Sequence, residues 1–387
     1  MPALSNKNYF NYGGQGPLPE PSLQAIISSW REIQELGPFS NDVCPYISNE
    51  TSKTRQVLAR LCGVNQKRLA LTENVSSGCV LPLWGIPFNT GDHILISDCE
   101  HPGVVAACYE IARRFNLYID IFKVQKIKYF QENQHNLFER ILNLIEQQLK
   151  SNTRLVVISH LLWNTGLIMP IKEISKMILN HSSKPFLLVD GAQSFGQISS
   201  IEEASSSDIY AFTGHKWAFG PEGLGGVALS ERILSEAHPT LIGWRALKDE
   251  NIYERNNSFH KDSRRFEIAT SCVPLMAGLR RSLELLESEG NIEHRLLKIK
   301  DLSAKLWEGI SRINNSTPFL NSPPPSGLIS FYINNEYSTK KTIQKLCEKK
   351  VFLRSLEQPK LIRACVHITT EEEEIYLLIK ALKEVLN

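Results

Sequence analysis

An acidic residue and a lysine stand at the ends of two apolar runs in the middle of the chain. Asp190 closes the run Pro185–Asp190, and Lys216 comes shortly after the run Ile209–Thr213. If both runs are parallel strands of one sheet, the two side chains meet at the edge formed by the carboxyl ends, where such sheets bind ligands. A carboxylate beside an amine can be an ordinary salt bridge. The same pair also suits covalent catalysis through the lysine amine.

A third segment supplies groups that bind phosphate. Asn74-Val75-Ser76-Ser77-Gly78 follows the apolar run Leu69–Thr72 and opens a predicted helix over Ser76–Trp84. Hydroxyls and free backbone N–H groups at a helix start bind phosphate, although an ordinary serine N-cap gives the same pattern. Pyridoxal 5′-phosphate requires such a phosphate cup, a lysine that forms a Schiff base and a carboxylate facing the ring nitrogen. The three segments together predict a site for this cofactor.

A regular scaffold must position these residues. Short apolar runs alternate with amphipathic stretches, and several runs are nearly continuous in apolar residues, as are strands buried on both faces. The predicted strands are Leu69–Thr72, His93–Ser97, Leu117–Phe122, Arg154–Ser159, Pro185–Asp190, Ile209–Thr213 and Gly226–Leu229. Helices are expected at Ser76–Trp84, Pro102–Phe115, Leu137–Lys150 and Ile171–Asn180. The alternation predicts an α/β fold with a mostly parallel, seven-stranded sheet covered by helices.

The pattern changes after about residue 260. Long helices are predicted first, then short strands and shorter helices, at Leu275–Ser288, Ile292–Ile313, Leu328–Ile333, Thr339–Lys349, Leu361–Ile368 and Glu371–Leu386. We expect a large domain over residues 20–260. The N-terminal arm, residues 1–19, is expected to join residues 261–387 in a small α+β domain.

The composition excludes several classes of protein. The 387 residues include 43 Lys and Arg against 41 Asp and Glu, a balance that argues against a nucleic-acid binder. No apolar run approaches the roughly 18 residues of a membrane span, and Met1–Lys7 does not resemble the start of a signal peptide. The eight cysteines include no CxxC pair, which speaks against a zinc site. We expect a metal-free, cytoplasmic protein with reduced thiols.

From about Tyr9 to its end, the chain resembles the class V aminotransferase superfamily, the fold-type I pyridoxal-phosphate enzymes. The most specific matches are Asp190-Gly191-Ala192-Gln193 and Thr213-Gly214-His215-Lys216 with its glycine-rich continuation. The resemblance implies that Lys216 holds the cofactor through a Schiff base and that Asp190 pairs with the ring nitrogen. It also implies that Gln193 contacts the ring hydroxyl.

The same resemblance assigns the rest of the cofactor site. Val75, Ser76, Thr213 and His215 would hold the phosphate, and His101 would stack on the ring and help to move protons. A surface histidine at a helix start is the plainer interpretation of His101. Asn164 matches a position near the ring hydroxyl or the substrate. Thr270 matches a segment that reaches the phosphate of the other subunit in family dimers, which implies a homodimer with a shared active site.

Arginine is the fitting partner for the carboxylate of an amino-acid substrate, because its guanidinium binds both oxygens. Arg363 matches the carboxylate-binding arginine of the family. Arg354 is a second cation nearby that suits a substrate with two carboxylates, although a structural ion pair explains it equally well. Trp244 is a candidate for the substrate pocket or for the core.

Cysteine desulfurases of this superfamily carry a nucleophilic cysteine on the loop before that arginine. The segment between Arg354 and Arg363, expected to be a short loop, contains none, and Cys365 lies beyond it. A closer resemblance is to the cyanobacterial L-cysteine/cystine C–S lyases. It is carried by residues 9–19, 159–166, 243–245 and 264–271.

The closer resemblance implies a β-lyase reaction without an enzyme thiol. Lys216 would remove the Cα proton, and the products would be pyruvate, ammonia and cysteine persulfide or sulfide. Alternatives within the fold are a cysteine desulfurase or selenocysteine lyase, and a class V aminotransferase. An iron–sulfur assembly protein is a candidate acceptor for the released sulfur.

Overall fold

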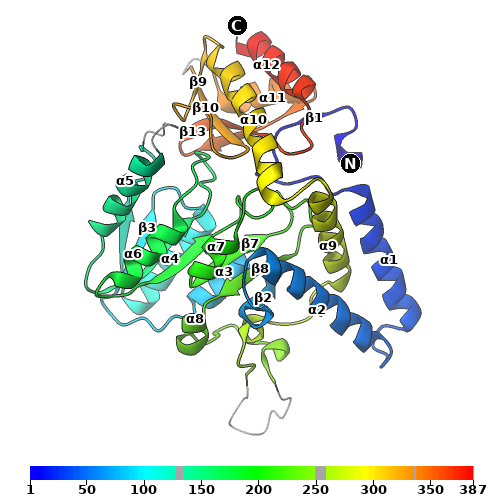
Figure 1. Ribbon diagram of the computed structural model, residues 1–387, viewed down its shortest axis with the longest axis vertical. Helices are drawn as coiled ribbons and strands as arrows, with labels where there is room; N and C mark the ends of the chain where they lie inside the picture. The colour runs from blue at the N-terminus through cyan, green and yellow to red at the C-terminus, as the bar shows by residue number, and fades with distance from the viewer. Residues whose placement is uncertain (128–133, 249–258, 335–336, 387) are drawn as a thin grey trace.

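A seven-stranded sheet forms the centre of the molecule. The structure is a computed structural model that describes residues 1–127, 134–248, 259–334 and 337–386 (Figure 1). In sheet order, the strands are β2 (Leu69–Thr72), β8 (Gly225–Leu229), β7 (Ile209–Thr213), β6 (Phe186–Asp190), β5 (Thr153–Ser159), β3 (His93–Ser97) and β4 (Tyr118–Phe122). Strands β7, β6, β5, β3 and β4 run parallel, and β8 is antiparallel to both of its neighbours. The predicted mostly parallel sheet is confirmed.

Both faces of this sheet are buried, which explains the continuous apolar runs. Along β5, Leu155 and Val157 pack on one face, whereas Val156 and Ile158 pack on the other. Helix α4 (Pro102–Phe115) covers the first face, while α5 (Gln134–Glu146) and α6 (Ile171–Asn180) cover the second. Three shorter helices follow strands of the sheet, namely α3 (Val75–Leu83), α7 (Ile201–Ser206) and α8 (Glu231–Glu236). Successive residues of a strand point to opposite faces, and here both sets of side chains are buried in apolar cores.

Three long helices, α1 (Glu20–Leu36), α2 (Val43–Leu61) and α9 (Val273–Ser288), pack together beside the sheet (Figure 1). Met276 and Leu279 of α9 belong to the same apolar core as the central strands. Gly278 lets α9 approach α1 closely, because a Cβ there would lie 2.5 Å from Ile26. The division predicted at residue 260 would assign α9 to the small domain. This packing leads us to propose a boundary after α9 instead.

The C-terminal part forms a second unit, at the top of Figure 1. Its antiparallel sheet has the order β12 (Arg354–Glu357), β13 (Lys360–Cys365), β10 (Leu328–Ile333) and β9 (Ser316–Pro318). Helices α10 (Ile292–Ser311), α11 (Thr339–Glu348) and α12 (Glu372–Leu386) pack on it. The N-terminal arm joins this unit through β1 (Asn8–Tyr9), which pairs with β11 (Val351–Phe352).

The segment between Arg354 and Arg363 is a β-hairpin and not the expected loop. Strands β12 and β13 pair antiparallel, and Arg354 lies directly opposite Arg363. Leu356 and Leu361 are buried, so the hairpin is fixed by its apolar side chains. Directly opposed residues of two strands point to the same face of a sheet. The hairpin therefore presents both guanidinium groups on one side.

Candidate active site

The carboxyl ends of β6 and β7 bring Asp190 and Lys216 together. Asp190 is buried and accepts a hydrogen bond from the backbone N–H of Ala192 at 2.8 Å. Within the described residues, the Lys216 ammonium makes no hydrogen bond or ion pair. Burial lowers the pKa of Lys216 to about 8, an effect that the Asp190 charge opposes and the Arg363 charge reinforces. An amine with this pKa has a far larger neutral fraction near physiological pH than an ordinary lysine, and the neutral form is the nucleophile or base.

Gln193 links this strand edge to the N-terminal arm. Its Nε2 donates to the carbonyl oxygen of Gly13 at 2.8 Å, and its Oε1 accepts from Trp217 Nε1 at 2.9 Å. One N–H of the amide is left for a ring hydroxyl. The arm also touches the lysine segment, because a Cβ on Gly16 would lie 2.0 Å from the Lys216 carbonyl oxygen. Only glycine allows this approach.

The segment predicted to hold phosphate lies where α3 begins. The N-cap of this helix is Asn74, whose side chain accepts from the Ser77 N–H at 2.9 Å. Ser76 is exposed and is not needed for the cap, so its hydroxyl is available to a ligand. Thr213 Oγ1 lies 2.8 Å from His215 Nδ1, and burial lowers the pKa of His215. Gly225 lies between Asn74 and Thr213 and brings the two segments together.

His101 is both the N-cap of α4 and a neighbour of the lysine. Its Nδ1 accepts a hydrogen bond from the Gly103 N–H at 3.2 Å. The ring lies 6.1 Å from the Trp163 ring in an edge-on arrangement. Burial lowers the pKa of His101, and the charge of Lys216 adds to this effect while Asp190 opposes it. The imidazole is therefore largely neutral at pH 7 and can accept a proton.

Arg363 is buried but incompletely bound. It donates to the Trp163 carbonyl oxygen at 3.0 Å and to Asn11 Oδ1 at 3.5 Å, whereas its Nε has no partner among the described residues. Asn164 is 1% exposed, and its Oδ1 is likewise unpartnered there. A buried polar atom without a partner costs free energy that a bound ligand can recover. These orphaned atoms fit the carboxylate and cofactor roles implied by the sequence.

Sequence reasoning missed Glu100, a fully buried carboxylate beside this site. It accepts hydrogen bonds from the hydroxyl of Ser97 and from the hydroxyl and backbone N–H of Ser159. Burial raises the pKa of Glu100 to about 7. Its position directly before His101 was the only signal in the sequence.

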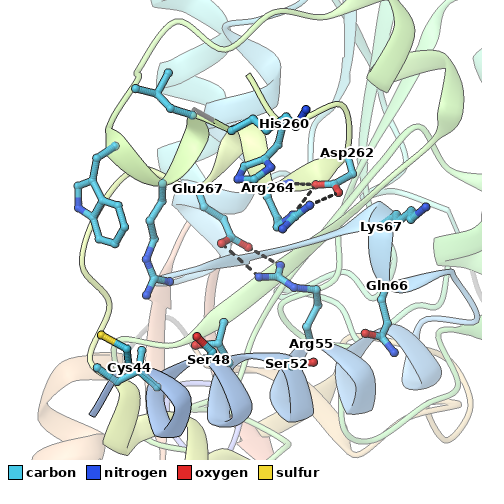
Figure 2. Close-up of a pocket in the computed structure, with 16 residues that line it drawn as sticks. Cys44, Ser48, Ser52, Arg55, Gln66, Lys67, His260, Asp262, Arg264 and Glu267 are labelled. Carbon is cyan, nitrogen blue, oxygen red and sulfur yellow. Dashed lines mark hydrogen bonds and ion pairs between the residues drawn. The ribbon is translucent and has the colours of Figure 1, made fainter. Parts of the chain in front are cut away.

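Two predicted site residues lie outside this cluster within one chain. Trp244 lines a separate pocket of about 670 Å³ beside α2, together with Arg55 and Glu267. Figure 2 shows this pocket, in which Arg55 pairs with Glu267 and Arg264 pairs with Asp262. Thr270 is exposed. Its expected role concerns a second subunit and stays a prediction.

The described residues contain neither a cluster of metal-binding side chains nor a membrane-spanning helix. No group of three or more His, Cys, Asp or Glu side chains there is arranged to hold a metal ion. Among the described helices, none combines the length and apolarity that crossing a membrane requires.

The comparisons with known proteins identify the family. The model of the aminotransferase class-V family matches residues 41–378. The chain belongs to this family. A probable cysteine desulfurase of Methanothermobacter thermautotrophicus is 22% identical over all of this chain and 96% of that protein. An isopenicillin N epimerase of Amycolatopsis lactamdurans is 24% identical over 99% of this chain and 95% of that protein.

Among solved structures, this class-V family member is similar to a cystine C–S lyase, C-DES, in complex with its reaction product cysteine persulfide. The two chains are 37% identical, align with a TM-score of 0.92 and each cover 99% of the other. The apo cysteine desulfurase of Thermococcus onnurineus NA1 is 19% identical with a TM-score of 0.87, covering 100% of this chain and 96% of that chain. The second similarity shows the shared fold.

Proposed function

We propose that this chain is a pyridoxal-phosphate-dependent C–S β-lyase that acts on L-cystine or L-cysteine. The observation that carries the proposal is the half-buried amine of Lys216, which has no partner among the described residues and whose pKa is lowered. The charges of Asp190 and Arg363 act on this amine, and the segment between Arg354 and Arg363 contains no cysteine. The similarity to C-DES over the whole chain supports this choice within the family.

The residues present fit the cofactor. Lys216 would hold it, Asp190 would face its ring nitrogen and the remaining N–H of Gln193 would reach its hydroxyl. Val75, Ser76, Thr213 and His215 surround the start of α3 and the end of β7, where a phosphate would be held. When bound, the cofactor withdraws electrons from the substrate Cα and so acidifies its proton.

The protein groups then divide the remaining tasks. The uncharged form of the Lys216 amine accepts the Cα proton and later returns a proton to the product. His101 covers the site and holds a neutral imidazole beside it. Arg363 orients the α-carboxylate, Asn164 contributes its free amide oxygen, and Arg354 faces the second carboxylate when the substrate is cystine.

The overall reaction needs no enzyme thiol. Cystine and water give pyruvate, ammonium and cysteine persulfide, because the C–S bond breaks as the Cα proton leaves. Cys365 is buried, and burial raises the pKa of its thiol, so it is a poor nucleophile. We therefore place the desulfurase alternative second. An iron–sulfur assembly protein remains our proposed acceptor for the released sulfur.

We also propose a homodimer in which each subunit completes the site of the other. Trp244, Leu241 and Ile242 are all about half exposed, an unusual concentration of apolar surface. Thr270 and Trp244 lie outside the Lys216 cluster of their own chain. A second copy would cover this surface and bring these residues to the partner's site.

The test is product analysis with the holoenzyme. Incubation with cystine is expected to give equal amounts of pyruvate and persulfide, and Lys216→Ala is expected to abolish both. Cys365→Ser separates the lyase from the desulfurase, because a lyase keeps its pyruvate production. Loss of activity in Cys365→Ser, with an enzyme-bound persulfide in the wild type, would contradict the proposal.

A further inference from the structure

A cavity of about 950 Å³ lies between α4 and the β12–β13 hairpin. Its walls come from Val105, Ala106 and Tyr109 of α4 and from hairpin residues 354–359. Lys216, Asp190, His215 and Ser76 are not among its lining residues. Trp163, Asn164 and Arg354 do line it, so the cavity adjoins the candidate active site along these three residues.

The charges around the cavity leave one cation without a partner. Asp98 accepts two backbone N–H groups, at 2.9 and 3.0 Å, and Glu100 accepts three hydrogen bonds. Glu357 pairs with Lys340 at 3.0 Å. Arg354 is exposed and makes no ion pair within the described residues. A ligand with an anionic group would therefore be drawn to the Arg354 end of the cavity.

A second polar group in the wall lacks a partner. The Nε1 of Trp163 is buried and makes no hydrogen bond within the described residues. The indole N–H is only a donor, so it requires a carbonyl or carboxylate oxygen. The Trp163 ring lies edge-on to His101, which connects this donor to the reaction site. The indole N–H and the Arg354 guanidinium are thus two donors beside the cavity that have no partner among the described residues.

The cavity, at about 950 Å³, has room for more than a single amino acid. Pockets of about 300–1,000 Å³ hold drug-sized ligands, and the leaving half of cystine is only one cysteine. We propose that the cavity binds the sulfur-bearing leaving half of a larger substrate, a mixed disulfide between cysteine and a small peptidic thiol. This inference rests on the proposed function and extends it to a substrate class.

The chemistry balances without any oxidant or reductant. The free cysteine half of the disulfide enters the site, loses its Cα proton to Lys216, and its Cβ–S bond breaks. The electron pair of that bond leaves with sulfur, and one proton joins it to give the peptidic persulfide. Water then converts the three-carbon fragment to pyruvate and ammonium. The peptide carboxylate would meet Arg354, and a peptide carbonyl would accept from Trp163.

The probe is the mixed disulfide of cysteine and glutathione. Its glutathione half has an acylated cysteine amine, so only the free cysteine half can react. The holoenzyme is given cystine or the mixed disulfide. Initial rates of pyruvate release are measured, and the persulfide is alkylated and identified by mass. We expect glutathione persulfide as the product, with a kcat/KM for the mixed disulfide at or above that for cystine.

Ala106→Trp tests the cavity directly. Ala106 is exposed on α4 and lines the cavity, so an indole there fills space without disturbing the core. We expect it to lower the ratio of kcat/KM for the mixed disulfide to that for cystine by about tenfold or more. Arg113→Trp is the matched control, because Arg113 is exposed on the same helix outside the cavity. It is expected to leave the ratio unchanged.

The outcomes separate this inference from the proposed function. If cystine is cleaved and the mixed disulfide is not, the cavity assignment is wrong and the lyase function stands. An equal loss for both substrates in Ala106→Trp would also overturn it, because the cavity would then be a common route. If neither substrate yields pyruvate, the proposed function itself fails.

Discussion

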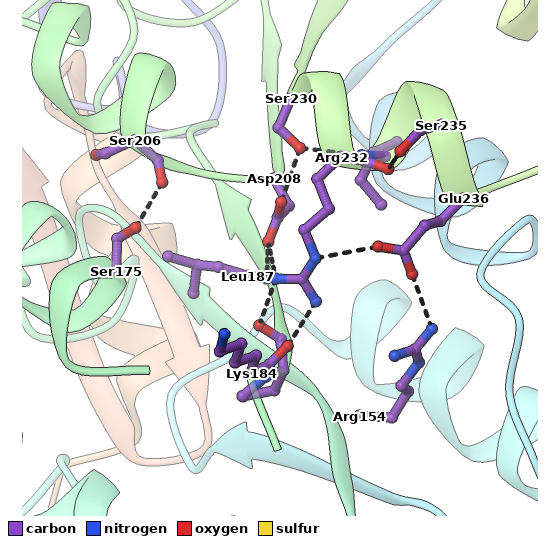
Figure 3. Close-up of polar contacts among 12 residues, drawn as sticks. Arg154, Ser175, Lys184, Leu187, Ser206, Asp208, Ser230, Arg232, Ser235 and Glu236 are labelled. Carbon is purple, nitrogen blue, oxygen red and sulfur yellow. Dashed lines mark hydrogen bonds and ion pairs between the residues drawn. The ribbon is translucent and has the colours of Figure 1, made fainter. Parts of the chain in front are cut away.

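The charged side chains at the amino ends of the central strands (the amino edge) and those at their carboxyl ends (the carboxyl edge) differ in how they are paired. At the amino edge, Arg232 of α8 lies 3.6 Å from Asp208 and 3.5 Å from Glu236, and Arg154 lies 3.1 Å from Glu236 (Figure 3). Asp208 also accepts from the Ser230 hydroxyl at 2.7 Å and from a backbone N–H. These charges are ion-paired within the chain, although the Nε of Arg154 is buried without a hydrogen-bond partner among the described residues.

At the carboxyl edge, polar groups are buried without partners. Asn164 Oδ1, Trp163 Nε1 and Arg363 Nε make no hydrogen bond among the described residues. The half-buried Lys216 amine makes none there either. Folding leaves these groups unsatisfied, at a cost of about 1–3 kcal/mol for each buried group. A fold retains such groups where a ligand satisfies them. The arginines of the amino edge are ion-paired, whereas Lys216 and Arg363 at the carboxyl edge make no ion pair among the described residues, and this difference marks the functional end of the sheet.

The largest expected effect is on catalysis at the carboxyl edge. Arg363→Met keeps most of the side-chain volume and removes the guanidinium that would hold the substrate carboxylate. We expect kcat/KM for cystine to fall by about 100-fold or more, since a buried charge pair truncated on one side costs about 2–5 kcal/mol. The melting temperature is expected to change little, because replacing an incompletely paired buried charge by an apolar side chain is often neutral. A steady-state pyruvate assay and a thermal melt measure the two.

At the amino edge, Arg232→Met is the substitution that corresponds to Arg363→Met. Arg232→Met leaves the buried Asp208 without its cation, so we expect about 3 kcal/mol of lost stability. The kcat/KM per folded molecule should not change. Denaturant unfolding and the pyruvate assay test this pair of outcomes.

Arg113→Met is the surface control, since the Arg113 side chain is 70% exposed, and little change is expected. Equal effects of Arg232→Met and Arg363→Met on activity would remove the distinction between the edges.

The sequence predicted the features that depend on local pattern. Continuous apolar runs revealed the strands, and the polar residues following them revealed Asp190 and Lys216. Glu100 was missed because its partner Ser159 lies on a strand distant in the sequence. Gln193 likewise meets Gly13, which is 180 residues away. Such contacts arise only from tertiary packing. The hairpin was taken for a loop because its strands are short and its ends are charged, although Leu356 and Leu361 anchor it.

A third test uses the pH dependence of stability. Burial raises the folded-state pKa of Glu100 from 4.5 to about 7. Between these values the folded protein binds more protons than the unfolded chain, so the contribution of Glu100 to stability is lost as pH rises. Glu100→Gln removes this dependence. The unfolding free energy of the variant minus that of the wild type should therefore increase between pH 5 and 7.5, by at most about 3 kcal/mol.

Glu110→Gln provides a control of opposite sign. Glu110 is exposed, and its hydrogen bonds with Arg113 and Arg114 lower its pKa. Its contribution is present above pH 4.5 and is lost as pH falls from 4.5 toward 2. In that lower range the corresponding difference should therefore decrease as pH rises, whereas it should stay flat between pH 5 and 7.5. Chemical unfolding at several pH values measures both variants. If the difference in unfolding free energy between Glu100→Gln and the wild type does not change with pH, the folded-state pKa of Glu100 is not raised.

The smallest expected effect concerns the pKa of Lys216. The cofactor-free protein should take up pyridoxal phosphate through the neutral amine, whose pKa burial lowers to about 8. The uptake rate should therefore rise about tenfold per pH unit below pH 8 and level off above it. A lysine with its ordinary pKa of 10.5 would give a rate that still rises at pH 10. Stopped-flow absorbance at a series of pH values records this profile.

Arg354→Gln refines the same measurement. Burial is the main cause of the lowered pKa of Lys216, and the charge of Arg354 makes a smaller contribution in the same direction. Removing this charge should move the levelling-off point upward by a fraction of a pH unit. Lys341→Gln, on α11 outside the site, should not move it. A shift in both variants would mean that the net charge of the molecule sets the pKa of Lys216. A shift in Arg354→Gln alone means that the nearby charge of Arg354, at the carboxyl edge, influences the pKa of Lys216.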